Sequence, residues 1–145
     1  MNPRDPQPTF HVGQTFTRDL LIDDALVRAF AEVSGDRNPI HLDEEVARSS
    51  RFGQRIAHGG ILFALVSRVL GMDMPGVGTV YLGQTCAFLL PVFIGDTVRL
   101  EATLVDLEPK SIARIATVIT KQSGEVVMEG EARVKLPGWL FKAPA

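Results

Sequence analysis

The sequence is nearly free of cysteine, with Cys86 the only one among 145 residues. A single cysteine excludes an internal disulfide and suits a reducing compartment, so we expect a cytoplasmic protein. A strong excess of one charge is also missing, because 15 basic residues stand against 17 acidic residues and the formal net charge is −2. This balance argues against a nucleic acid or an anionic membrane as a partner held by bulk charge.

Long apolar runs are missing as well. The longest one, residues 61–66, ends at Ser67 and Arg68, far short of the roughly 20 residues that a membrane span needs. Residues 1–8 are polar and rich in proline, without the apolar centre of a signal peptide. We therefore predict no membrane segment and one domain over residues 1–145, with a loose arm at 1–11 and a tail at 138–145.

Several chemical motifs are absent too. The sequence has no Gly-x-Ser-x-Gly elbow, no phosphate-binding loop and no dinucleotide-binding glycine set. Its three histidines, His11, His41 and His58, lack the spacing of a metal site. Cys86 falls in a predicted strand, where we expect a core residue rather than a nucleophile. We therefore predict neither a metal nor a cofactor.

The first half of the chain has helical patterns. Asp23 is a typical N-cap for a helix over residues 24–34, and Gly35 ends it. Asp43 is a second cap, for a short helix over residues 44–47. A longer helix over residues 61–70 is apolar nearly all round, which predicts burial on most sides, and Gly71 suits its C-cap. The apolar stripe expected on the first helix comprises Ala25, Leu26, Ala29, Phe30 and Val33.

The second half has strand patterns. Residues 97–104 alternate, with Val98, Leu100, Ala102 and Leu104 on one face. Residues 126–136 alternate in the same way, whereas residues 112–120 carry apolar side chains on both faces, as expected if one face meets a helix and another meets a partner chain. A short extended segment is expected at 14–19, and a longer one, rich in apolar residues, at 79–90. Helices followed by antiparallel strands predict an α+β fold in which a curved sheet wraps the apolar helix.

Residues 34–41, with the sequence SGDRNPIH, place a carboxylate and an imidazole five positions apart. Gly35 and Pro39 prevent a regular helix, so a bend can direct Asp36 and His41 at one point. Such a pair can hold a water and move protons near neutral pH. Alternatively, Asp36 only caps a turn and His41 is a surface residue. In neither case do we expect these side chains in the core.

Residues 58–60, with the sequence HGG, precede the apolar helix. Free backbone N–H groups at a helix start favour negative charge, and glycine lets a ligand approach closely, so Gly59 is a candidate oxyanion donor for a thioester carbonyl. Alternatively, the glycines only permit a tight turn and close packing, and His58 bonds a neighbouring carbonyl. Ser67, inside the helix, either bonds a backbone carbonyl or faces the pocket.

Together these motifs resemble the MaoC-like (R)-specific enoyl-CoA hydratases, and especially the short stand-alone hydratases that feed polyhydroxyalkanoate synthesis. The resemblance covers about residues 12–137. It rests on FAEVSGDRNPIH at 30–41, FG at 52–53, IAHG at 56–59, YLGQ at 81–84, FLLPVFIGD at 88–96 and GEARVKLP at 130–137.

The resemblance implies a hot-dog fold, a homodimer, and reversible hydration of trans-2-enoyl-CoA to (R)-3-hydroxyacyl-CoA. It also implies that Asp36 and His41 are the catalytic pair, that the Gly59 N–H binds the thioester oxygen, and that Asn38 supports the loop. Two rivals share the fold: a dehydratase of 3-hydroxyacyl groups on acyl-carrier protein, with the same residues, and a thioesterase, with its carboxylate elsewhere. A non-catalytic acyl-CoA-binding module needs neither Asp36 nor His41.

Overall fold

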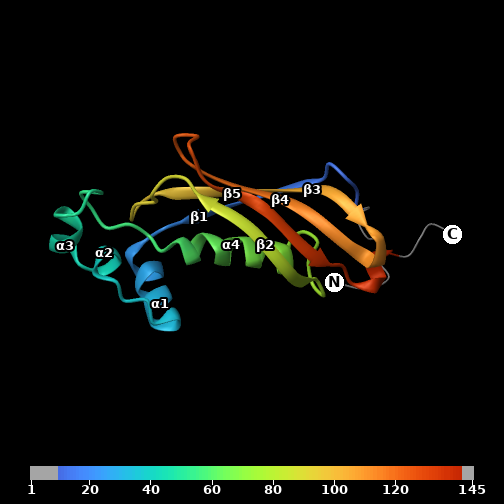
Figure 1. Ribbon diagram of the computed structural model, residues 1–145, viewed down its shortest axis with the longest axis horizontal. Coiled ribbons are helices and arrows are strands. Elements are labelled where there is room, and N and C mark those ends of the chain that lie inside the picture. Colours follow the sequence, from blue (N-terminus) through green and yellow to red (C-terminus); the bar gives the residue numbers. More distant parts are fainter. Residues whose placement is uncertain (1–9, 142–145) are drawn as a thin grey trace.

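A single antiparallel sheet organises the protein. The structure is a computed structural model that describes residues 10–141. Its strands pair in the order β1-β3-β4-β5-β2, so β1 and β2 form the two edges (Figure 1). The strands are β1 (Thr15–Leu21), β2 (Val80–Phe88), β3 (Thr97–Glu108), β4 (Ile112–Lys121) and β5 (Val126–Lys135).

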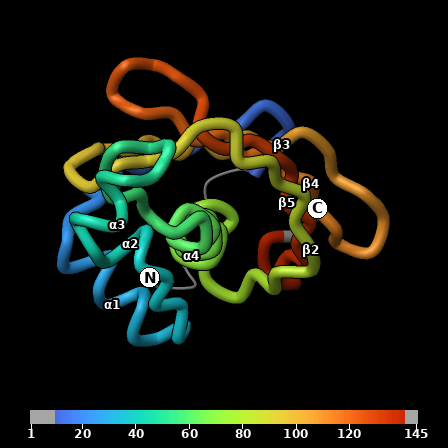
Figure 2. Tube along the Cα trace, turned by 60° about the vertical axis from the view of Figure 1, so that its left-hand side comes forward, coloured from blue at the N-terminus to red at the C-terminus, as the bar shows by residue number. Residues whose placement is uncertain are grey.

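Four α-helices accompany the sheet in the described part of the chain. Helix α4 lies inside the curve of the strands, which pass over and beside it when it is viewed nearly end-on (Figure 2). The other three gather beyond the first turn of α4, at one end of the sheet (Figure 1). This arrangement is the hot-dog fold that the sequence predicted. The helices are α1 (Asp24–Ser34), α2 (Pro39–Leu42), α3 (Glu44–Arg48) and α4 (Gly59–Met72).

The core lies between α4 and the concave face of the sheet. The predicted inward face of β3 is confirmed, since its four alternating apolar residues are fully buried. The alternation of β5 is interrupted, because the β4–β5 register shifts beside Ile119 and buries both Val127 and Met128. The buried residues of α4 are Ile61, Leu62, Leu65, Val66, Val69 and Leu70.

Helix α4 differs from the prediction in two respects. It runs from Gly59 to Met72, so Gly71 lies within the helix, and Asp73 is the C-cap, its N–H donating to the Val69 carbonyl. The helix is also not buried on most sides, because the sheet covers only one of its faces. Exposed residues on the other face are Phe63, Ala64, Ser67 and Arg68.

The side chains of α1 follow a different stripe from the predicted one. The cap is confirmed, since the Asp23 carboxylate accepts the Leu26 N–H at 2.8 Å. However, Val27 and Ala31 face the core, Leu26 and Phe30 are only half-buried, and the remaining predicted residues, Ala25, Ala29 and Val33, are exposed. The stripe therefore lies along an i, i+4 pair that the sequence pattern did not single out.

Strand β2 is more open than expected. Cys86 is exposed there, contrary to the prediction of a core cysteine. As an edge strand, β2 pairs only with β5, and its outer side meets no other strand among the described residues.

The two chain ends were expected to form a loose arm at 1–11 and a tail at 138–145. Residues 138–141 form a 3-10 turn, and Leu140 packs against the core. Residues 1–9 and 142–145 lie outside the described part of the chain. Between these limits, no helix has the length and apolar character to cross a membrane.

Candidate active site

A sharp turn after α1 presents Asp36. Gly35 ends the helix with a φ of 77°, in the left-handed region that favours glycine. The Ser34 hydroxyl donates to the Phe30 carbonyl at 2.6 Å and accepts the Asp36 N–H at 3.0 Å. These bonds redirect the chain within two residues. The Asp36 carboxylate remains about half-exposed, with 51% of its side chain accessible.

Asn38 and Pro39 then start a new helical turn. Asn38 lies outside the helical region, with φ −53° and ψ 125°, as a residue before proline should. Its side-chain oxygen accepts the Ile40 N–H at 3.3 Å, and its own N–H donates to the Asp36 carboxylate at 3.1 Å. The four-residue helix α2 follows and turns His41 inward. The stretch is therefore bent, as predicted, and closed by local hydrogen bonds.

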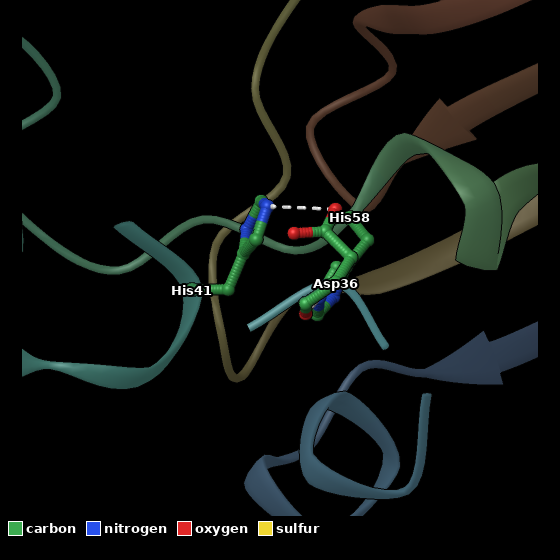
Figure 3. A group of neighbouring side chains, drawn as sticks. All are labelled: Asp36, His41 and His58. Carbon is green, nitrogen blue, oxygen red and sulfur yellow. Dashed lines mark hydrogen bonds and ion pairs between the residues drawn. The ribbon is translucent and has the colours of Figure 1, made fainter. Parts of the chain in front are cut away.

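His41 is buried, which corrects the expectation that it lies outside the core. Its Nδ1 lies 2.7 Å from the Ile56 carbonyl oxygen. Because a carbonyl can only accept, Nδ1 carries the hydrogen, and in the neutral ring Nε2 keeps its lone pair. That Nε2 lies 3.9 Å from Asp36 Oδ2, and the two groups face each other across this gap (Figure 3).

His58 joins the same group from the residue before α4 (Figure 3). Its ring stacks on that of His41, with centroids 3.8 Å apart. Its Nε2 donates to the Asp36 backbone carbonyl at 2.9 Å. The bond of His58 to a neighbouring carbonyl is therefore present, and the carbonyl belongs to Asp36. The buried Nδ1 of His58 has no partner within residues 10–141.

Gly59 is the first residue of α4 and directly follows His58. Its N–H meets no acceptor within the described residues, and it points out of a helix start, where the helix dipole favours negative charge. Gly60 has a packing role, since a Cβ there would lie 2.5 Å from the Phe30 ring. The HGG motif thus combines one free donor with one glycine that close packing requires.

Ser67 does not join this group. It lies eight residues beyond Gly59, which is about 12 Å along a helix. It is exposed, and no hydrogen bond of its hydroxyl to a backbone carbonyl is found in the described chain. The expectation of such a bond is therefore wrong, because the face of α4 that carries Ser67 is not covered by the sheet.

The sequence spacing did not reveal that Asp36, His41 and His58 each place a possible metal-ligand atom within 4.8 Å of the others. The stacking of the imidazoles disfavours a shared ion. A ring centroid lies about 3.2 Å from a metal bound through nitrogen, so two rings at a tetrahedral angle are roughly 5 Å apart. The observed 3.8 Å is too short. The prediction of no metal stays a prediction.

Arg55 belongs to no motif in the sequence, yet it is buried, with 6% of the residue exposed. Its guanidinium bonds the His41 carbonyl and the Asp24 carboxylate. Hydrogen bonds from Arg28 and from Arg55 hold the pKa of Asp24 below its ordinary value. No local pattern marks this arginine, because its partners lie 14 and 31 residues away along the chain.

Comparisons with known proteins agree with the predicted family. An (R)-specific enoyl-CoA hydratase of Aeromonas caviae is 44% identical over 130 residues, covering 89% of this chain and 97% of the relative. A 3-hydroxybutyryl-CoA dehydratase of Methylorubrum extorquens is 46% identical over 127 residues, covering 87% of this chain and 80% of the relative. The solved structure of an (R)-hydratase from A. caviae involved in PHA biosynthesis has a TM-score of 0.87 at 43% identity, covering 90% of this chain and all of that one.

Residues 5–127 match the family described as the MaoC like domain. This range spans the Asp36–His41 loop, the HGG motif and most of the sheet. Together with relatives above 40% identity over nearly the whole chain, this match establishes that the protein belongs to the MaoC-like family.

Proposed function

We propose that the protein catalyses the reversible, (R)-specific hydration of trans-2-enoyl-CoA to (R)-3-hydroxyacyl-CoA, as the names of its relatives suggest. The observation that carries this proposal is the gap between Asp36 Oδ2 and His41 Nε2. At 3.9 Å it is too long for a direct hydrogen bond. A water about 2.8 Å from both atoms would see them at an angle of roughly 90°, so one water can bind both.

Hydration uses this water as the nucleophile. Its oxygen bonds to the β-carbon, and the π electrons move through the α-carbon to the thioester oxygen. Asp36 and His41 act as one unit that accepts the proton of the water and returns a proton to the α-carbon. Asn38 supports the arrangement, because its N–H holds the other carboxylate oxygen of Asp36. Dehydration is the same sequence in reverse.

The thioester oxygen gains negative charge during this step. We assign the Gly59 N–H as the donor to this oxygen, since the N–H is unpaired among the described residues, adjacent to His58 and directed out of the α4 start. The open face of α4 continues from Gly59 towards Ser67. We assign Ser67 a supporting role along this face, beside the acyl chain. The coenzyme A arrives with the substrate.

Crotonyl-CoA tests the function directly. Hydration removes its conjugated absorbance without releasing thiol, whereas a thioesterase releases free thiol. Chiral analysis should identify the product as (R)-3-hydroxybutyryl-CoA. The same assays with the acyl group carried on acyl-carrier protein test the rival dehydratase. Thiol release without loss of the double bond, or turnover only on the carrier protein, would contradict the proposal.

We further propose a homodimer that uses β2. This edge strand and the residues after it expose apolar side chains, which monomers rarely leave uncovered together. Strand β4 supports a partner contact less than β2 does, because its outward side chains, such as Val118, are already half-buried in one chain. The exposed set comprises Val80, Leu82, Phe88, Leu89 and Leu90, with Phe63 on α4 nearby in the fold.

Sedimentation equilibrium tests the dimer. Wild type should be dimeric at micromolar concentration, and Leu82→Lys should shift it towards monomer because it places a charge in the apolar set. A wild-type monomer would remove the claim. We also keep the cytoplasm as the proposed compartment, in line with the single exposed cysteine.

A further inference from the structure

Arg55 is the one lysine, arginine, aspartate or glutamate that is buried within residues 10–141. Such a charge needs close partners, because burial without them is costly. Its Nη2 lies 2.6 Å from Asp24 Oδ1, and its Nη1 lies 3.5 Å from Glu44 Oε1. The guanidinium therefore joins the first turn of α1 and the first turn of α3 from the segment that leads into α4.

The third contact reaches the candidate active site. Arg55 Nε donates to the backbone carbonyl of His41 at 2.7 Å. Helix α2 has only four residues, so this carbonyl has no partner inside its own helix. A charge-assisted bond from a planar guanidinium fixes both the distance and the direction of the contact with this carbonyl.

The next residue holds the other end of His41. The Ile56 carbonyl accepts the His41 Nδ1–H at 2.7 Å, and the Ile56 N–H donates to the Ile40 carbonyl at 3.3 Å. Two consecutive residues thus hold the main chain and the ring of His41. Since the ring is held on its Nδ1 side, the direction of Nε2 depends on where the backbone of His41 lies.

We propose that Arg55 is a positioning residue for the hydration reaction: by binding the His41 carbonyl and the Asp24 carboxylate together, it keeps His41 Nε2 directed at the water shared with Asp36. This inference rests on the proposed function for its kinetic consequence. Its structural consequence, a single Nδ1–H tautomer of His41, does not depend on which reaction the protein catalyses.

Two substitutions test the role. Arg55→Met keeps the length of the side chain and removes all donors. Arg55→Lys keeps the charge for Asp24, but a single ammonium cannot reproduce the two-nitrogen contact with carboxylate and carbonyl. Each variant should lose roughly 10–100-fold in kcat, the scale of a misplacement near 1 Å, with KM within about twofold of wild type.

Arg18→Met is the matched control. Arg18 makes a comparable two-nitrogen contact with Asp73, at 3.2 and 3.3 Å, between β1 and the C-cap of α4. The Arg18→Met variant should change the melting temperature and leave kcat within about twofold of wild type. If Arg18→Met lowers kcat as much as the Arg55 variants do, loss of stability explains all three and the positioning role is rejected.

Long-range proton–nitrogen NMR of the His41 ring supplies a measurement independent of turnover. Wild type should show the Nδ1–H tautomer alone, and both Arg55 variants should show a mixture of tautomers. A single Nδ1–H tautomer in both variants overturns the proposal, whatever their rates, and so does wild-type kcat in a folded Arg55→Lys protein. If wild type does not hydrate crotonyl-CoA, the proposed function fails, and the NMR comparison still decides the role of Arg55.

Discussion

Substituting Gly59 with proline removes one backbone donor and leaves α4 intact. Gly59 is the first helical residue, a position that tolerates proline because its N–H has no partner in the helix. His58 before it already has the extended backbone that a following proline requires, with φ −62° and ψ 136°. If the Gly59 N–H stabilises the thioester oxygen, its loss should lower kcat on the order of 10²–10³-fold, or about 2.7–4 kcal/mol of transition-state stabilisation.

Gly59→Ala separates the donor from crowding. An added Cβ would lie 3.0 Å from the Phe88 ring in either variant, but alanine keeps the N–H. Both variants place the same Cβ against that ring, so its crowding is common to the two and the comparison isolates the N–H. We expect alanine to cost much less than proline in kcat for crotonyl-CoA hydration, with both melting temperatures near that of wild type. Equal rates for the two variants, or normal hydration by a folded Gly59→Pro protein, would show that another group binds the oxyanion.

Three further predictions concern the proposed catalytic pair, the sheet and acid stability. Asp36→Asn and His41→Gln should each lose more than about 10² in kcat, and the double variant little more than the worse single one; additive losses in steady-state assays would contradict a pair that acts as one unit. His41→Gln should also lose about 1 kcal/mol of unfolding free energy by denaturant titration, since its buried Nδ1–H bond is removed. Gly130→Ala should destabilise the protein strongly, because its Cβ would lie 1.7 Å from the backbone oxygen of Thr85, and an unchanged melting temperature would refute this clash. Burial alone would raise the pKa of Asp96, but bonds from Gln122, the Phe93 N–H and Lys121 hold that pKa below its ordinary value of 3.8. The ionised Asp96 carboxylate therefore stabilises the fold above pH 3.8, and this stabilisation is lost as the pH falls through the lower folded pKa. In thermal melts, the melting-temperature advantage of wild type over Asp96→Asn should disappear between about pH 5 and strongly acidic pH.

The sequence was sufficient for the features whose causes are local. Asp23 caps α1, Gly35 ends it, and Asp43 caps α3 through bonds to the next two or three residues. The inward face of β3 follows from period-2 alternation, which any paired strand must obey. Each of these outcomes depends on a few neighbouring residues, so the pattern alone determines it.

The predictions that the structure contradicts share a different cause. Gly71 was expected to end α4, but the helix continues to Met72. Val33 fits a helical stripe and is nonetheless exposed, because the contact face of α1 depends on how the helix lies against distant segments. Burial of His41 was missed for the same reason, since the segment that covers it begins 14 residues later, at Arg55. These properties require the tertiary arrangement, which no local spacing encodes.

The position of the proposed catalytic pair, Asp36 and His41, depends mainly on backbone groups. The Ile56 carbonyl holds the His41 ring, and the Asp36 carbonyl is held in turn by His58. The same segment is anchored to the chain that precedes β3, because the Ala57 N–H donates to the Val92 carbonyl at 2.7 Å and Ile56 forms a bridge with Phe93. Backbone contacts leave little trace in residue identity, so the motif indicates which side chains are proposed to react, whereas the distance between them is set largely by backbone groups of a segment that lies about 15 residues further along the chain.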